Sequence, residues 1–197
     1  MVIIMNITTL VENIKLKTQE KTPFLVAIDG RCGSGKSTLG GELQKIFDCN
    51  LFQMDDFYLR PEQRTPERYA EPGGNVDYER FLEDVLVPVR DGIEFSYRPF
   101  DCNIWNLGEA VQASPHAVNI VEGSYSLHPL LREFYDYKIF LDISKEEQMR
   151  RIVRRNGEEK ALEFRDRWIP LEELYFAKYN VHELCDYVWG KDENIIF

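Results

Sequence analysis

Apolar positions along the chain follow two patterns, short continuous runs and runs with helical spacing. The continuous runs are typical of strands that are buried on both faces of a sheet. We expect such strands at residues 24–28, 50–54, 117–121, 137–143 and, at the end of the series, 187–189. Apolar residues with helical spacing predict helices at residues 7–17, 36–47, 77–87, from about 145 onward, and at about 171–184.

This alternation of strands and helices predicts an α/β fold. Strands that are separated by helices pair in parallel, and the helices cover both faces of the sheet, which gives a three-layer sandwich. Ligands of such sheets bind at the carboxyl ends of the strands. Residues 59–76 are rich in Pro, Gly and charged residues and are interpreted as a loop.

A glycine-rich segment follows the first predicted strand. Gly30-Arg31-Cys32-Gly33-Ser34-Gly35-Lys36-Ser37 fits the pattern G-x-x-x-x-G-K-[ST], which makes the chain a candidate P-loop NTPase. Glycines let backbone N–H groups approach phosphate oxygens, and the helix that starts at Lys36 directs its positive end toward them. We expect Lys36 to reach the β and γ oxygens of ATP and the Ser37 hydroxyl to bind Mg²⁺. The expected nucleotide-binding residues are Gly30, Gly33, Ser34, Gly35, Lys36, Ser37 and Thr38.

Acidic residues stand after the second and third predicted strands. Asp55 and Asp56 follow the second strand, and Glu122 follows the third. Adjacent residues of a strand point to opposite faces, so only one of the two aspartates is expected to face an acceptor hydroxyl. At this edge of the sheet an acidic group is also placed to act on Mg²⁺.

Together with the arginine-rich segment 150–155, these motifs make the chain resemble the uridine kinase family of P-loop kinases, whose relatives include pantothenate kinase, nicotinamide riboside kinase and phosphoribulokinase. The resemblance runs from about residue 24 to residue 167, and the Asp-x-Phe-Tyr element at residues 55–58 is its most specific part. It implies one kinase domain over residues 1–197, an acceptor-binding insertion at about 59–115 and an arginine-rich lid at about 150–167.

The resemblance also implies roles for individual residues. Asp55 matches the catalytic aspartate, and Glu122 matches an acidic residue that lies near Mg²⁺ together with Ser37. Guanidinium groups of the lid stabilise charge on the transferred phosphoryl group. The matching lid residues are Arg150, Arg151 and Arg154, whereas Arg155 stands where uridine kinases usually have Asp. With Asp55 and Lys36, we take Arg150 and Arg154 as the catalytic candidates.

The acceptor side departs from the pattern of the family. Uridine kinases hold the base with a Tyr-Asp pair and a His four residues later, and here the matching positions are Phe100-Asp101 and Trp105. We therefore expect uridine itself to be a weak acceptor. Asp77 matches the aspartate that binds the ribose, so a nucleoside-like acceptor is preferred over a pantothenate-like molecule or a sugar phosphate. The full set of acceptor-binding candidates is Asp55, Tyr58, Asp77, Arg98 and Asp101.

Two other functions compete with that of a small-molecule kinase. A GTPase switch requires a D-x-x-G segment and an N-K-x-D segment, and the sequence has neither. A P-loop module that binds ATP without transferring it would leave the Asp-x-Phe-Tyr element and the lid arginines without a role. ATP turnover that is stimulated by an acceptor distinguishes a kinase from both.

Composition restricts the partners. The net charge of −10 argues against nucleic acid and against anionic membrane surfaces. The four cysteines form no CxxC pair, and with the three histidines they give no metal-binding spacing. The apolar run at residues 1–5 is short and has no basic segment before it, so we expect a cytoplasmic protein with reduced thiols. A homo-oligomer stays open.

Overall fold

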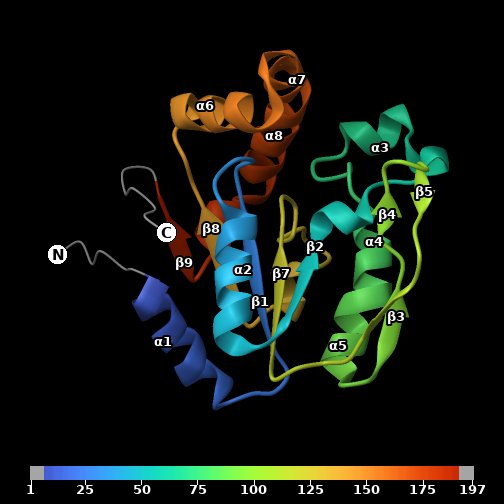
Figure 1. Ribbon diagram of the computed structural model, residues 1–197. Coiled ribbons are helices and arrows are strands. Elements are labelled where there is room, and N and C mark those ends of the chain that lie inside the picture. The colour runs from blue at the N-terminus through green and yellow to red at the C-terminus, as the bar shows by residue number, and fades with distance from the viewer. Residues whose placement is uncertain (1–6, 191–197) are drawn as a thin grey trace.

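The computed structural model describes residues 7–190 and has at its centre a sheet of five parallel strands (Figure 1). The strand order is β2-β7-β1-β8-β9, so the strand that leads into the phosphate loop, β1, is the central one. The strands are β1 (Phe24–Gly30), β2 (Asn50–Gln53), β7 (Val118–Glu122), β8 (Tyr137–Leu141) and β9 (Tyr187–Trp189). All five lie where the sequence predicts a strand. The apolar run at residues 1–5 lies outside the described residues.

Helices cover both faces of this sheet, as the alternation of elements predicts. Side chains of β1 alternate between two apolar cores: Val26 and Ile28 pack with α1 (Ile7–Thr18) and α2 (Lys36–Phe47). Leu25 and Ala27 face the other core. Apolar side chains of the helical segments 78–89 and 175–176 also belong to this core. The three-layer α/β fold is therefore confirmed.

The segment between β2 and β7 holds more regular structure than its composition suggests. Within residues 59–76, which were interpreted as a loop, a 3-10 turn (Pro61–Gln63) and the short helix α3 (Pro66–Ala70) form. The next helix continues to residue 91, beyond its predicted end at 87. It consists of α4 (Tyr78–Phe81), a wider π-helical turn (Leu82–Leu86) and α5 (Val87–Asp91). Two hairpins follow, β3 (Phe95–Tyr97) with β6 (Val111–Ala113) and β4 (Phe100–Asp101) with β5 (Asn106–Leu107).

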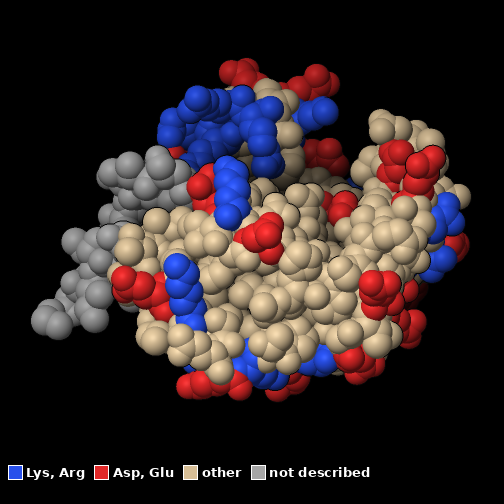
Figure 2. All heavy atoms as spheres, turned by 60° about the horizontal axis from the view of Figure 1, so that its bottom comes forward, with Lys and Arg blue, Asp and Glu red and all other residues tan. Residues whose placement is uncertain are grey.

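After β8 the chain is almost entirely helical. α6 (Lys145–Asn156) ends at Gly157, and α7 (Glu158–Glu163), a π-helical turn (Phe164–Trp168) and α8 (Ile169–Tyr179) continue from there. The helix expected at 171–184 thus begins earlier and ends at 179, before a 3-10 turn (Val181–Leu184). Lys and Arg side chains gather over α6 in the space-filling view (Figure 2). Among the described residues, no helix has the length and apolar character that crossing a bilayer requires.

Candidate active site

The phosphate loop closes tightly on the end of β1. Gly30, Gly33 and Gly35 have φ values of +138°, +76° and +105°, a region that residues with a side chain rarely adopt. A Cβ atom on Gly30 would lie 2.2 Å from the carbonyl oxygen of Leu141, so this glycine is required by space as well as by φ. The loop therefore presents backbone and not side chains at the start of α2, the arrangement that an oligophosphate needs.

Lys36 lies in the first turn of α2, and its side chain folds back over the loop. Its ammonium group donates to the carbonyl oxygens of Gly30 at 2.7 Å and Arg31 at 3.0 Å. Beside it the hydroxyl of Ser34 is buried and, within the described part of the chain, has no hydrogen-bond partner. A cation and an unsatisfied polar group at one glycine-lined turn fit a bound phosphate, so the residues present suit a nucleotide.

Ser37 and Glu122 meet at the carboxyl end of β7. Burial raises the pKa of Glu122, while a hydrogen bond with Ser37 and the charge of Lys36 act in the opposite direction. Ser37 and Thr38 are exposed in the first turn of α2. The structure thus brings together the two predicted Mg²⁺ ligands. Within residues 7–190 no group of three or more His, Cys, Asp or Glu side chains could hold a metal ion.

The aspartate pair lies in a turn and not in the strand. β2 ends at Gln53, one residue earlier than expected, and Met54–Phe57 form a 3-10 turn. The expectation that strand alternation separates Asp55 from Asp56 is therefore wrong. Both carboxylates are still close enough to Glu122 to raise its pKa.

The surroundings of the two aspartates nevertheless differ. Asp55 is exposed and hydrogen-bonds with Tyr58, whose pKa is raised by burial and then by this carboxylate. Asp56 is half-buried, and its pKa is raised by burial and by Asp55, while the guanidinium of Arg80 lowers it. Asp55 is thus the carboxylate open to an incoming hydroxyl, and Tyr58 lies beside it.

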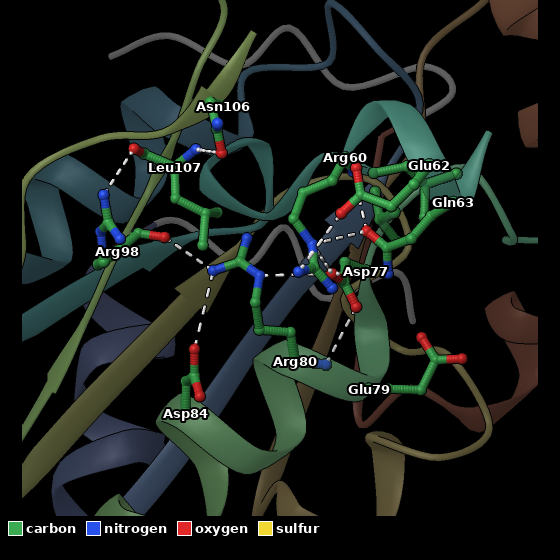
Figure 3. A network of polar contacts seen from close by, with 12 residues as sticks. Arg60, Glu62, Gln63, Asp77, Glu79, Arg80, Asp84, Arg98, Asn106 and Leu107 are labelled. Atoms are coloured by element: carbon green, nitrogen blue, oxygen red, sulfur yellow. Dashed lines mark hydrogen bonds and ion pairs between the residues drawn. The ribbon is translucent and has the colours of Figure 1, made fainter.

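Asp77 is the centre of a polar network in the insertion (Figure 3). Its Oδ1 accepts a hydrogen bond from the backbone N–H of Arg80 at 3.2 Å and caps α4, while its Oδ2 accepts one from Gln63 at 2.9 Å. The guanidinium groups of Arg60 and Arg80 approach it within 3.8 Å and 3.4 Å. Only 2% of Asp77 is exposed. Its predicted role toward an acceptor diol stays a prediction.

Arg98 and Asp101 hold the hairpin of β4 and β5. Arg98 donates to the carbonyl oxygens of Gly108 at 2.7 Å and Leu107 at 3.0 Å. Asp101 accepts from the backbone and the side-chain amide of Asn103 at 2.7 Å and 2.9 Å. These contacts give both residues a structural role in the hairpin, and their binding roles also stay predictions.

The helix α6 touches the phosphate loop through one face. Gln148 donates to the carbonyl oxygen of Cys32 at 3.1 Å, and Arg151 donates to those of Gly33 and Ser34 at 3.3 Å and 3.4 Å. Of the three matched lid arginines, Arg151 therefore lies against the loop. Arg150 is exposed and pairs with Glu147, and Arg154 is exposed as well.

Two buried carboxylates that sequence reasoning missed fasten the loop. Asp29 accepts hydrogen bonds from four donors, and burial raises its pKa to about 6. The donors, at 2.7 to 3.2 Å, are the backbone N–H groups of Gly30, Tyr125 and Leu127 and the hydroxyl of Tyr175. An acidic residue directly after an apolar run was the available signal.

The second missed residue is Glu172, in α8. It accepts from the backbone N–H of Cys32 at 3.0 Å and from the Ser124 hydroxyl at 2.6 Å. In the sequence it is one of many charged residues on a helix, so nothing marked it. Asp29 and Glu172 together tie β1, the turn after β7 and α8 to one another at the phosphate loop.

Comparison with known proteins gives relatives for this arrangement. No family model matches the chain. A uridine kinase from Clostridium perfringens is 31% identical over 145 residues, which cover 68% of this chain and 69% of that protein. A uridine kinase from Latilactobacillus sakei is 26% identical over 182 residues, covering 87% and 83% of the two chains. The solved structure of a possible uridine kinase from Bacillus stearothermophilus has the same fold, with a TM-score of 0.66, 17% identity and coverage of 92% and 100%.

Proposed function

This chain belongs to the uridine kinase family, and on that premise we propose that it transfers the γ-phosphoryl group of ATP to a hydroxyl group of a nucleoside-like small molecule. One observation carries the proposal. The phosphate loop with Lys36, the Ser37–Glu122 contact and the exposed Asp55 converge at the carboxyl ends of three neighbouring strands, β1, β7 and β2. A nucleotide-binding module without transfer would need only the first two of these features.

The residues would act as follows in the transfer. The N–H groups of the loop and the start of α2 hold the phosphates, and Lys36 exchanges its bonds to two carbonyl oxygens for bonds to phosphate oxygens. Mg²⁺ bound at Ser37 and Glu122 would neutralise charge on the phosphate chain. Asp55 orients the acceptor hydroxyl and takes its proton. Arg151, which already lies against the loop, adds a guanidinium group to the developing charge.

The acceptor is nucleoside-like in this proposal, with uridine a weak substrate. Phe100 is buried and Trp105 exposed at the two positions where a phenol and an imidazole would read the base. Without those groups the polar edge of a pyrimidine lacks partners, at about 1–3 kcal/mol for each unsatisfied group.

ADP release measured with and without hydroxyl-bearing metabolites tests the proposal. A kinase shows turnover that an acceptor stimulates, and the Lys36→Ala variant loses it. A thermal-shift screen with a non-hydrolysable ATP analogue identifies the acceptors that bind. Turnover that no nucleoside, vitamin or sugar phosphate stimulates contradicts the assignment as a kinase of small hydroxyl acceptors.

A further inference from the structure

An arginine lies against the two aromatic side chains that replace the expected base-reading residues. The guanidinium carbon of Arg64 lies 5.4 Å from the ring centre of Phe100 and 4.6 Å from that of Trp105. Trp105 is held there with a φ of +52° between the strands β4 and β5. Contacts of this kind stabilise a cation by about 0.5–2 kcal/mol each. The two rings therefore fix the position of the Arg64 charge.

Arg64 differs from most other arginines of the insertion in its partners, although Arg98 likewise bonds only to carbonyl oxygens. Arg60 and Arg80 approach Asp77, and Arg68 pairs with Glu79 at 2.6 Å. Within residues 7–190, no carboxylate comes within 4.0 Å of the Arg64 guanidinium, and the side chain makes one hydrogen bond, from Nε to the carbonyl oxygen of Leu59 at 2.9 Å. The N–H donors of its two terminal NH₂ groups therefore remain available to a ligand. The chain as a whole carries a net charge of −10.

A series of contacts connects this arginine with the proposed general base. Asp55 hydrogen-bonds with Tyr58, and the Tyr58 ring packs edge-on against Phe100 with ring centres 6.5 Å apart. Phe100 in turn lies under Arg64. This series of neighbouring side chains defines a direction in which an acceptor with its hydroxyl group at Asp55 would extend toward Arg64.

We propose that Arg64 determines acceptor specificity by binding an anionic group, a carboxylate or a phosphate, at the end of the acceptor remote from the reacting hydroxyl. This inference rests on the proposed function, because it takes Asp55 as the place of the reacting hydroxyl. A guanidinium held against aromatic rings has a fixed plane, and its in-plane donors match the two oxygens of such a group. A lysine at this position would supply the charge without the fork.

Matched pairs of acceptors that differ by one anionic group test the assignment. The probes are orotidine against uridine, pantothenate against pantothenol, and ribose 5-phosphate against ribose. Binding is measured by calorimetry with a non-hydrolysable ATP analogue present, and turnover is measured by ADP release. We expect one anionic member to bind about 10- to 100-fold more tightly than its neutral partner, the range of one charge-assisted pair.

Variants assign that preference to Arg64. Arg64→Gln is expected to remove it, raising KM for the anionic acceptor about 10- to 100-fold while kcat at saturation and KM for ATP stay unchanged. Arg64→Lys should restore only part of the affinity. Arg132→Gln is the matched control, since it removes an equal charge at a half-exposed residue whose one ion pair within residues 7–190 is with Glu133. A preference that survives Arg64→Gln, or neutral members that bind as well as anionic ones, overturns the proposal.

The two readouts separate this inference from the proposed function. Binding of an anionic probe that depends on Arg64, without any stimulated ADP release, supports the site and contradicts the kinase assignment. Turnover with neutral nucleosides and no dependence on Arg64 supports the kinase and contradicts the site. If no anionic probe binds at millimolar concentration, the anion site is refuted.

Discussion

The nucleotide end and the acceptor end of this molecule are built in different ways. At the nucleotide end, the seven-residue strand β1 and helices of eleven or twelve residues meet one contiguous loop. The buried carboxylates Asp29 and Glu172 tie that loop to the core through backbone N–H groups. At the acceptor end, elements of two to five residues are held by arginine side chains, such as Arg98 across its hairpin and Arg68 on Glu79. A contiguous motif can be recognised in a sequence, whereas a network of side chains brought together by folding cannot.

The largest predicted effect comes from removing a positive charge at the nucleotide end. Lys36→Ala is expected to lower kcat by at least about 10²-fold, because the ammonium group faces the charge that develops on the transferred phosphoryl group. The fold should persist, since the Lys36 side chain contacts loop carbonyls and not the apolar cores. ADP release and a thermal melt measure the two effects.

The control for this variant lies on the same helix. Lys45 is exposed and, in the described part of the chain, pairs with Glu42 alone, so Lys45→Ala should leave both activity and melting temperature unchanged. A Lys36→Ala enzyme that keeps more than about a tenth of wild-type kcat is incompatible with the phosphate-loop assignment.

The next largest effect is expected at Asp55 and Asp56, which lie between the nucleotide end and the acceptor end. Asp55→Asn should lower kcat roughly 10²-fold with little change in KM for ATP, because a general base acts on the acceptor hydroxyl. Asp56→Asn should act mainly on stability, since the Asp56 carboxylate is half-buried near Arg80. Both variants are assayed at saturating acceptor. An inactive Asp56→Asn beside an active Asp55→Asn would exchange the two roles.

His128, in the segment after β7, packs against α4 and gives a smaller, pH-dependent effect. The His128 ring stacks on Tyr78 of α4 with centres 3.8 Å apart, and burial, followed by the charge of Arg68, lowers its pKa from 6.5 to about 4. The fold therefore favours the neutral ring. This contribution to stability is complete above pH 6.5 and is lost as the pH falls from 6.5 toward 4.

Urea unfolding at about pH 7 and pH 5 measures this loss, which should be about 2 kcal/mol for His128 at the lower pH. His128→Phe keeps a ring on Tyr78 but cannot titrate, so its stability should fall by about 2 kcal/mol less than that of the wild type. His116 is exposed, and His116→Gln should follow the wild type. Equal pH dependence of the wild type and His128→Phe would show that folding does not lower the pKa of His128.

Periodicity and one motif were enough to predict most of the nucleotide end. The five strands, α2 and the Ser37–Glu122 contact follow from short-range patterns and from the rule that ligands bind at the carboxyl ends of strands. The break between α6 and α7 falls at Asn156 and Gly157, a pair that favours turns. The lid expected at residues 150–167 and the catalytic roles of its arginines stay predictions.

The expectations from sequence are wrong or incomplete at positions where tertiary contacts, and not the local pattern, determine the structure. At Asp55 a 3-10 turn forms where a strand end is expected, and the helix expected to end at residue 87 passes through Pro88, after the π-helical turn Leu82–Leu86. Glu172 and Arg64 acquire their places only from contacts between residues that are far apart in the sequence. Neither periodicity nor spacing contains that information.

The smallest predicted effect concerns the carboxylate of Asp136, which directly precedes β8 and joins β1 to α5. Asp136 accepts from Lys21 at 2.7 Å, from the backbone N–H of Leu25 in β1 at 2.9 Å and from Arg90 in α5 at 2.9 Å. Burial alone would raise the pKa of Asp136, but the hydrogen bonds from Arg90 and Lys21 outweigh it and hold the pKa below its usual value.

The shorter of the two ion pairs at Asp136 should contribute less to stability. The Lys21 side chain is 51% exposed, so water screens its charge, and Lys21→Ala should cost less than about 1 kcal/mol of unfolding free energy. Arg90 is 21% exposed and also donates to the carbonyl oxygens of Pro23 and Phe134, which Arg90→Ala leaves without this partner. That variant should cost about 1–3 kcal/mol. Urea unfolding of both variants measures the two losses of unfolding free energy. A larger loss for Lys21→Ala than for Arg90→Ala would mean that the contact distance, and not burial, determines how much each ion pair contributes.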